Sequence, residues 1–157
     1  MDPSQDLGNN MLKNLSTIVL VVLLSACSRE NIPFSSGALT GQPTESPASW
    51  LDVASVEIIQ LETTGDEPYS VNLWVIGKQD WMYVYAGDNY STWAEHLENN
   101  PMARIEIEGK LYGVRAMRVT DQVEFENFAA DWDAKYGSTN PQGLNVGDVW
   151  LYRLAAN

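Results

Sequence analysis

Short runs with the two-residue period of β-strands recur along the chain, and they restrict it to a mainly antiparallel β fold. Polar turns rich in Gly, Asp, Asn or Pro separate most of these runs. Six runs have the pattern, at residues 56–63, 69–76, 81–86, 103–108, 111–119 and 149–154. Strands joined mainly as hairpins cannot each bury an apolar face alone, so they predict a closed or split barrel.

Two segments change to a helical period. Thr92 and Glu95 have the spacing of a capping box and predict a short helix. Asp121 with Glu124 predicts the start of a second helix, which Gly137 ends. We interpret its apolar stripe as core and not as a cofactor site; the stripe consists of Phe125, Phe128, Ala129, Trp132 and Tyr136. The predicted fold is therefore mainly β with two helices, a six-stranded antiparallel split β-barrel.

The N-terminal segment, residues 1–26, has the layout of a secretion signal peptide. A short positively charged stretch begins at Met11 and precedes an apolar run over residues 15–24. This run is half the roughly twenty residues that a membrane-spanning helix needs. Asp2 and Asp6 put acid where a signal carries positive charge, so we expect translation to begin at Met11.

The apolar run ends in a sequence that resembles the lipobox of bacterial lipoproteins. Leu24, Ser25 and Ala26 precede Cys27, the only cysteine of the chain. The resemblance implies cleavage before Cys27 and its acylation, and each buried methylene of an acyl chain contributes about 0.8 kcal/mol to anchoring. Ser28 resembles the residue that follows the cysteine in lipoproteins of the outer membrane. We therefore expect a lipid-anchored protein of the cell envelope, on the periplasmic face of the outer membrane.

Residues 27–50 are predicted to form the lipidated cysteine and a flexible tether, and residues 51–157 to form the folded domain. Ser, Pro, Gly and Thr dominate the tether, which has no sustained apolar period. A flexible chain of this length reaches on the order of 25 Å. That reach is enough to hold the domain clear of the lipid headgroups.

The charge and the scarcity of Cys and His exclude several classes of partner. The formal net charge of −12 opposes nucleic-acid binding, which depends on clustered Lys and Arg. Anionic headgroups would also repel the chain, so its membrane attachment has to be covalent. One cysteine and one histidine cannot form a disulfide or a transition-metal centre, and we predict no metal site.

Seven stretches match a known family in their order and spacing, at residues 61–65, 71–74, 83–87, 93–101, 109–112, 135–137 and 152–154. The segment 56–154 thereby resembles the split-barrel flavoprotein superfamily, which includes deazaflavin-dependent nitroreductases and pyridoxamine-phosphate-oxidase-like proteins. The resemblance implies FMN or a deazaflavin in a groove between barrel strands and the first helix, with hydride passing to a stacked substrate. Carried over by position, Thr64, Asn72 and Trp74 lie near this groove, and Tyr85, Ala86, Gly87 and Trp93 line the cofactor's other side.

Acidic side chains stand where the resemblance implies cations. Asp66 and Glu67 follow the Thr-Thr-Gly turn, where relatives carry Arg or Lys for the cofactor phosphate. Tyr85 and Asp88 replace further basic residues after the third strand. Carboxylates repel phosphate, so the basic phosphate anchors of FMN or a deazaflavin are missing from this pattern.

Two functions are consistent with these observations. The acidic replacements favour a non-catalytic envelope lipoprotein that binds a small ligand, for example an aromatic one, or a protein partner. The alternative is a flavin- or deazaflavin-dependent oxidoreductase of the nitroreductase type, which the Thr-Thr-Gly turn and the aromatic groove favour. His96 is more typical of a packing residue than of a general acid or base, and no catalytic residue is assigned. Split barrels commonly form homodimers, so a homodimer is expected by fold analogy.

Overall fold

The structure is a computed structural model that describes residues 37–87 and 90–157. The predicted signal peptide, the lipidation site Cys27 and the first part of the predicted tether lie outside the described residues. Within the described ranges, no helix is both long enough and apolar enough to cross a membrane.

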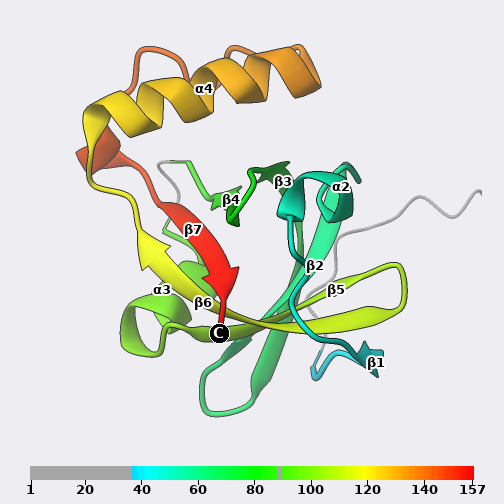
Figure 1. The fold of residues 1–157 in the computed structure, drawn as a ribbon. Helices are drawn as coiled ribbons and strands as arrows, with labels where there is room; N and C mark the ends of the chain where they lie inside the picture. Colours follow the sequence, from blue (N-terminus) through cyan, green and yellow to red (C-terminus); the bar gives the residue numbers. More distant parts are fainter. Residues whose placement is uncertain (1–36, 88–89) are drawn as a thin grey trace, which may run out of the picture. The chain divides into compact units, whose positions relative to one another are not determined.

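Six antiparallel strands close into a barrel (Figure 1). They are β2 (Ile58–Thr64), β3 (Pro68–Gly77), β4 (Trp81–Tyr85), β5 (Met102–Ile107), β6 (Lys110–Arg118) and β7 (Leu151–Ala156). Neighbours around the barrel run β2, β3, β4, β7, β6 and β5, and β5 pairs again with β2. The predicted fold class is confirmed, and each predicted strand is present with ends that differ by no more than two residues.

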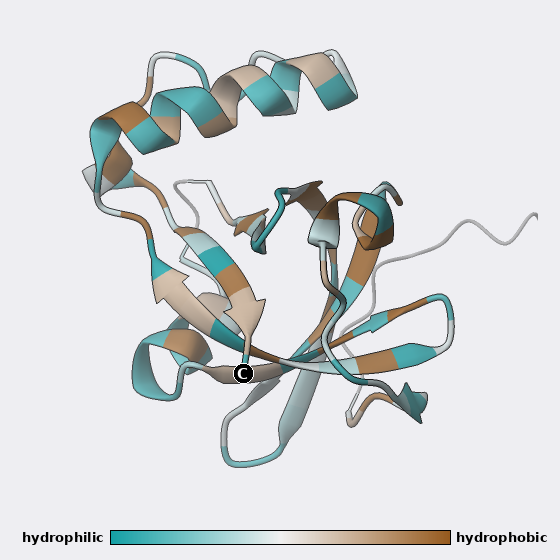
Figure 2. Ribbon diagram, in the orientation of Figure 1, coloured by the Kyte–Doolittle hydropathy of each residue, from teal (hydrophilic) through white to brown (hydrophobic). Residues whose placement is uncertain are grey.

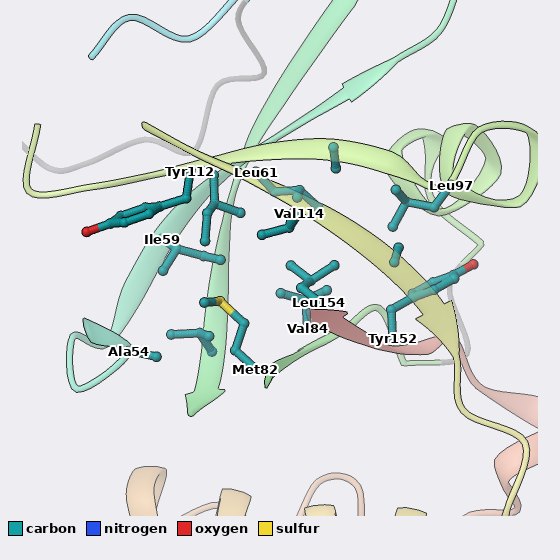
Figure 3. Packing of buried hydrophobic residues seen from close by; sticks show 14 of the residues in the cluster. Ala54, Ile59, Leu61, Met82, Val84, Leu97, Tyr112, Val114, Tyr152 and Leu154 are labelled. Carbon is teal, nitrogen blue, oxygen red and sulfur yellow. The ribbon is translucent and has the colours of Figure 1, made fainter. Parts of the chain in front are cut away.

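Alternate residues of every strand fill the barrel interior. Along β5, Ala103, Ile105 and Ile107 are buried, while the residues between them are partly exposed. Figure 3 shows the interior side chains of several strands pointing toward one another, among them Ile59, Leu61, Met82, Val84, Val114 and Leu154. Full burial of such a side chain stabilises the folded chain by about 1.5–3 kcal/mol, so this cluster supplies much of the driving force for barrel closure.

Two helices match the sequence prediction, α3 (Thr92–Asn99) and α4 (Gln122–Tyr136). Asp121 caps α4 by accepting a hydrogen bond from the Glu124 N–H, and Gly137 ends the helix in the left-handed conformation, φ 62°. The predicted capping box of α3 is wrong by one residue. Ser91 is the N-cap and Thr92 is already helical, because the Ser91 carbonyl accepts the Glu95 N–H at 3.0 Å.

The structure also contains three short elements that the sequence pattern did not predict. They are the two-residue strand β1 (Gln42–Pro43), the one-turn helix α2 (Trp50–Val53) and a 3₁₀ turn, η1 (Val146–Asp148). Each is too short to show a period of its own. The described part of the chain therefore has three α-helices, where two were predicted.

Helix α4 packs on the outer side of the barrel, over residues of β3, β4 and β7 (Figures 1 and 2). Phe125, Phe128 and Trp132 of α4 form a second apolar cluster with outward-facing strand residues such as Tyr83 and Leu151. The interpretation of the aromatic stripe as core is confirmed. The outer faces of β3 and β4 therefore carry large apolar side chains where α4 covers them.

Part of the predicted tether packs on the barrel. In the N-terminal strap, which we define as residues 39–44, the Leu39 side chain is buried. The Leu39 N–H donates to the Glu62 carboxylate, and the strap's β1 pairs in parallel with β6. The packed part of the chain thus begins before residue 51.

Candidate ligand-binding site

The turn between β2 and β3 faces α3 across a small cavity of about 390 Å³. The lining comprises Thr64, Gly65, Asp66, Glu95, His96 and Asn99. This is the turn at which the family resemblance implies contact with a cofactor phosphate. Two carboxylates line the cavity, and none of its described lining residues is Lys or Arg.

His96 is held in place by the barrel. Its Nδ1 lies 3.0 Å from the Thr63 hydroxyl, and its ring meets the Tyr69 ring edge-on, with centroids 5.6 Å apart. The ring also lies against Gly65: a Cβ added to this glycine would come within 2.5 Å of His96 Nε2. These contacts agree with the interpretation of His96 as a packing residue, and Gly65 is required for the close approach.

The seven predicted groove residues fall in separate places. Thr64 lies at the small cavity, whereas Asn72 and Trp74 lie on the outer face of β3. Trp93 is buried inside the barrel, where its ring packs against Tyr152. Its side chain therefore belongs to the apolar core of the barrel.

The remaining predicted residues lie at and after the end of β4. Tyr85 packs under α4 against Phe128 and Trp132. Ala86 and Gly87 continue from the strand, where the Ala86 N–H donates to the Trp150 carbonyl and the Gly87 carbonyl accepts from the Trp150 N–H. Ligand contact by any of the seven residues stays a prediction.

Trp132 brings two of the predicted residues together. The ring centroid of Trp74 lies 5.4 Å from that of Trp132 and 5.2 Å from that of Tyr136, on which Trp74 stacks. The ring centroid of Tyr85 lies 5.6 Å from that of Trp132. The Tyr136 hydroxyl donates to the backbone of β3 at Val75, and burial raises the pKa of Tyr136. Sequence reasoning treated Trp132 and Tyr136 as core and missed that they join the outer aromatic surface at Trp74.

A second, larger cavity of about 720 Å³ lies between α4 and the barrel. We call it the α4 groove; its walls come from the β3–β4 turn, from β4 and β7, and from the first three turns of α4. Residues lining it are Lys78, Gln79, Asp80, Trp81, Tyr83, Asp121, Val123, Glu124, Asn127, Ala130, Asp131 and Arg153. None of them is among the groove residues that the sequence analysis assigned.

Glu124 is the centre of the charged network in the α4 groove. Its carboxylate accepts hydrogen bonds from the Tyr83 hydroxyl at 2.7 Å and from two nitrogens of Arg153. Arg153 lowers the pKa of Glu124, and burial together with Glu124 raises the pKa of Tyr83. The Arg153 guanidinium also lies 5.2 Å from the centroid of the Trp81 ring. The partners of Glu124 are 41 and 29 residues away in sequence, so spacing gave no signal for this network.

No family model and no curated protein matches the chain in sequence. Solved structures do match it in fold. A FAD-binding protein from Mesorhizobium loti superposes with a TM-score of 0.53 at 14% identity, covering 80% of this chain and 94% of that one. A NimC/NimA family protein from Clostridium acetobutylicum superposes with a TM-score of 0.52 at 12% identity, covering 67% of this chain and 78% of that one. An F420 reductase superposes with a TM-score of 0.52 at 14% identity, covering 71% of this chain and 96% of that one. The domain is a split barrel.

This result confirms the fold that the resemblance implied. Identities this low establish the shared split-barrel architecture alone, because function resides in sites and not in folds. The site residues of this split barrel therefore have to be judged by their own chemistry.

The residues at the small cavity do not fit the phosphate of a flavin-type cofactor. The carboxyl groups of Asp66 and Glu95 would lie beside it, and carboxylates repel phosphate. Phosphate sites in proteins instead supply Arg, Lys or converging backbone N–H groups. Further along, Tyr85 is occupied by packing against α4, and Trp93 faces the core.

Proposed function

We propose that this protein is a lipid-anchored protein of the bacterial cell envelope whose split barrel binds a small ligand or a protein partner without flavin chemistry. The observation that carries the proposal is the acidic lining of the small cavity at the Thr64 turn, where Asp66 and Glu95 replace any cationic anchor. An anionic cofactor would have to overcome this repulsion, and the chain's net charge of −12 adds to it at long range.

The anchoring half of the proposal rests on the sequence. The charged start, the short apolar run and the Leu-Ser-Ala-Cys ending together predict export and acylation at Cys27. Eleven residues separate Cys27 from the first buried strap residue, Leu39.

The alternative is a flavin- or deazaflavin-dependent oxidoreductase. It is favoured by the fold shared with a FAD-binding protein and an F420 reductase, and by the Thr63-Thr64-Gly65 turn. In that case the cofactor would supply the redox chemistry, and a phosphate contact other than the Thr64 turn would be needed.

A fluorescence titration separates the two functions. The purified full chain is titrated with FMN and with a deazaflavin cofactor near physiological salt. We expect no saturable binding at micromolar concentrations, and we expect the charge-reversed variant D66K/E67R to bind at least as well as the wild type. Saturable micromolar binding by the wild type would make the oxidoreductase the better description.

Labelling tests the anchor. Bacterial cells expressing the chain are grown with radiolabelled palmitate, and envelope fractions are separated. We expect label on the wild-type protein in the membrane fraction and none on Cys27→Ser. Equal labelling of both chains would overturn the assignment of Cys27.

A further inference from the structure

The α4 groove has the size and the mixed lining of a small-molecule site. Its volume of about 720 Å³ falls within the range of pockets that hold small organic ligands. Trp81, Tyr83 and Val123 contribute aromatic and apolar surface to its walls. Groups of this kind bind the body of a ligand, while a few charged groups fix its orientation.

The charges of the groove are unbalanced. Four carboxylates line it, those of Asp80, Asp121, Glu124 and Asp131, against two cations, Lys78 and Arg153. Both cations already have partners, because Lys78 pairs with Asp131 at 2.5 Å and Arg153 pairs with Glu124.

Two carboxylates remain for a ligand. Asp80 has no ion pair among the described residues, and Asp121 uses one oxygen, Oδ1, to cap α4. The groove therefore presents negative charge next to an aromatic wall.

We propose that the α4 groove binds a small organic cation, an amino or guanidinium group attached to a planar or apolar body. The inference rests on the proposed binding function and names the ligand class. The cationic group pairs with one of the two remaining carboxylates, that of Asp80 or that of Asp121, and the body packs against Trp81 and Val123. Aromatic side chains add to the attraction of a cation through their negative ring faces. The net charge of the chain favours the approach of the same ligands.

Two probes of similar size and opposite charge test the ligand class. The purified full chain is titrated by calorimetry with phenethylamine and with 3-phenylpropionate, which share a phenyl ring and a short chain. We expect the amine to bind at least tenfold more tightly than the acid. Equal binding of the two probes, or no amine binding up to ~10 mM, would overturn the proposal.

Three variants locate the binding. D80N/D121N removes the charges of both remaining carboxylates. It keeps an N-cap for α4, because Asn is as good an N-cap residue as Asp. We expect the affinity for the amine to fall about tenfold. Asn127→Arg places a bulky cation in the groove from an exposed position and should abolish amine binding.

Glu126→Gln is the control. This substitution also removes a negative charge from α4, but Glu126 lines a different cavity. Its amine affinity should equal that of the wild type. Loss of affinity in this control as large as in D80N/D121N would show a general charge effect and overturn the site. The FMN titration decides the proposed function separately: FMN binding refutes that function, whereas amine binding that survives Asn127→Arg refutes only the groove.

Discussion

Two buried or half-buried carboxylates join segments that are distant in sequence. Glu62, 6% exposed, accepts two hydrogen bonds from Arg104, at 2.8 and 2.7 Å, and a third from the Leu39 N–H. Glu124 plays the same part between α4 and β7 through Arg153. A carboxylate left without its cation at either position would destabilise the fold. Each ion pair therefore stabilises the fold only when both partners are present.

Loss of the Glu124 charge should destabilise the fold in a pH-dependent way. Arg153 holds the pKa of Glu124 below its ordinary value of 4.5. The stabilisation is therefore present at neutral pH and is lost as the pH falls through the lowered pKa. Because Arg153 is about one-third exposed, we expect Glu124→Gln to reduce the free energy of unfolding by only about 1–2 kcal/mol at pH 7. Urea unfolding of both chains at pH 7, 5 and 3 should show the difference shrinking at the lowest pH; a constant difference would contradict this account.

A methyl group at position 65 should strain the packing of His96. Gly65→Ala places a Cβ within 2.5 Å of His96 Nε2, and the ring is held on its other side by Thr63. We expect a loss of about 1–3 kcal/mol in the free energy of unfolding. The double variant G65A/H96A should cost less than the sum of the single changes. Gly147→Ala is the control, because nothing lies within 4 Å of its added Cβ.

At the scale of elements, the two ends of α4 are fixed by different means. Its N-terminus is closed locally, by the Asp121 side chain. Near its C-terminus, the Lys135 ammonium donates to the carbonyls of Ala54, Val56 and Val75. Burial lowers the pKa of Lys135, and its ammonium group is hydrogen-bonded to all three carbonyls. These hydrogen bonds hold the C-terminal end of α4 on the barrel, next to the stacking of Trp74 on Tyr136.

The N-cap of α4 gives a test of its local stability. Asp121→Ala removes the acceptor of the Glu124 N–H and should reduce the free energy of unfolding by about 1 kcal/mol. Asp121→Asn keeps an acceptor of the same length and should be nearly neutral. Chemical unfolding followed by circular dichroism measures both. Equal losses in the two variants would mean that the charge, and not the cap, stabilises this end.

At the scale of the whole described domain, the strap ties the chain that leads to Cys27 to the β5–β6 side of the barrel. Gln42 and Thr44 donate backbone hydrogen bonds to the carbonyls of Gly109 and Leu111, at 2.8 and 2.9 Å. Together with the hydrogen bond from Leu39 to Glu62, these bonds join the strap to β2 and to the β5–β6 hairpin.

Truncation should show that the strap belongs to the folded domain. A chain that starts at residue 46 loses the buried Leu39 side chain and leaves Glu62 with one fewer donor. We expect it to unfold with a free energy about 2 kcal/mol lower than a chain that starts at residue 37. Thermal or urea unfolding of the two chains checks this. Equal stability would return these residues to the flexible tether.

Elements whose signals are local could be predicted from the sequence alone. Strand alternation, the Asp121 cap and the Gly137 stop depend on residues two to four positions apart, and all three are present in the structure. The resemblance also predicted the split barrel correctly. Several of the predicted groove residues lie on the predicted elements, but the Trp93 side chain is buried in the core.

The contacts between these elements could not be predicted from local sequence signals. The pairing of β6 with β7, the strap on β6, the Trp74 contact with α4 and the Glu124 network all join residues that are separated by tens of positions. Such contacts form because closing the barrel buries apolar surface from every strand at once, and no local pattern records which outward-facing side chains that closure brings together. The α4 groove exists for the same reason: its charged residues are ordinary surface residues in the sequence, and the packing of one helix on the barrel gathers them around one cavity.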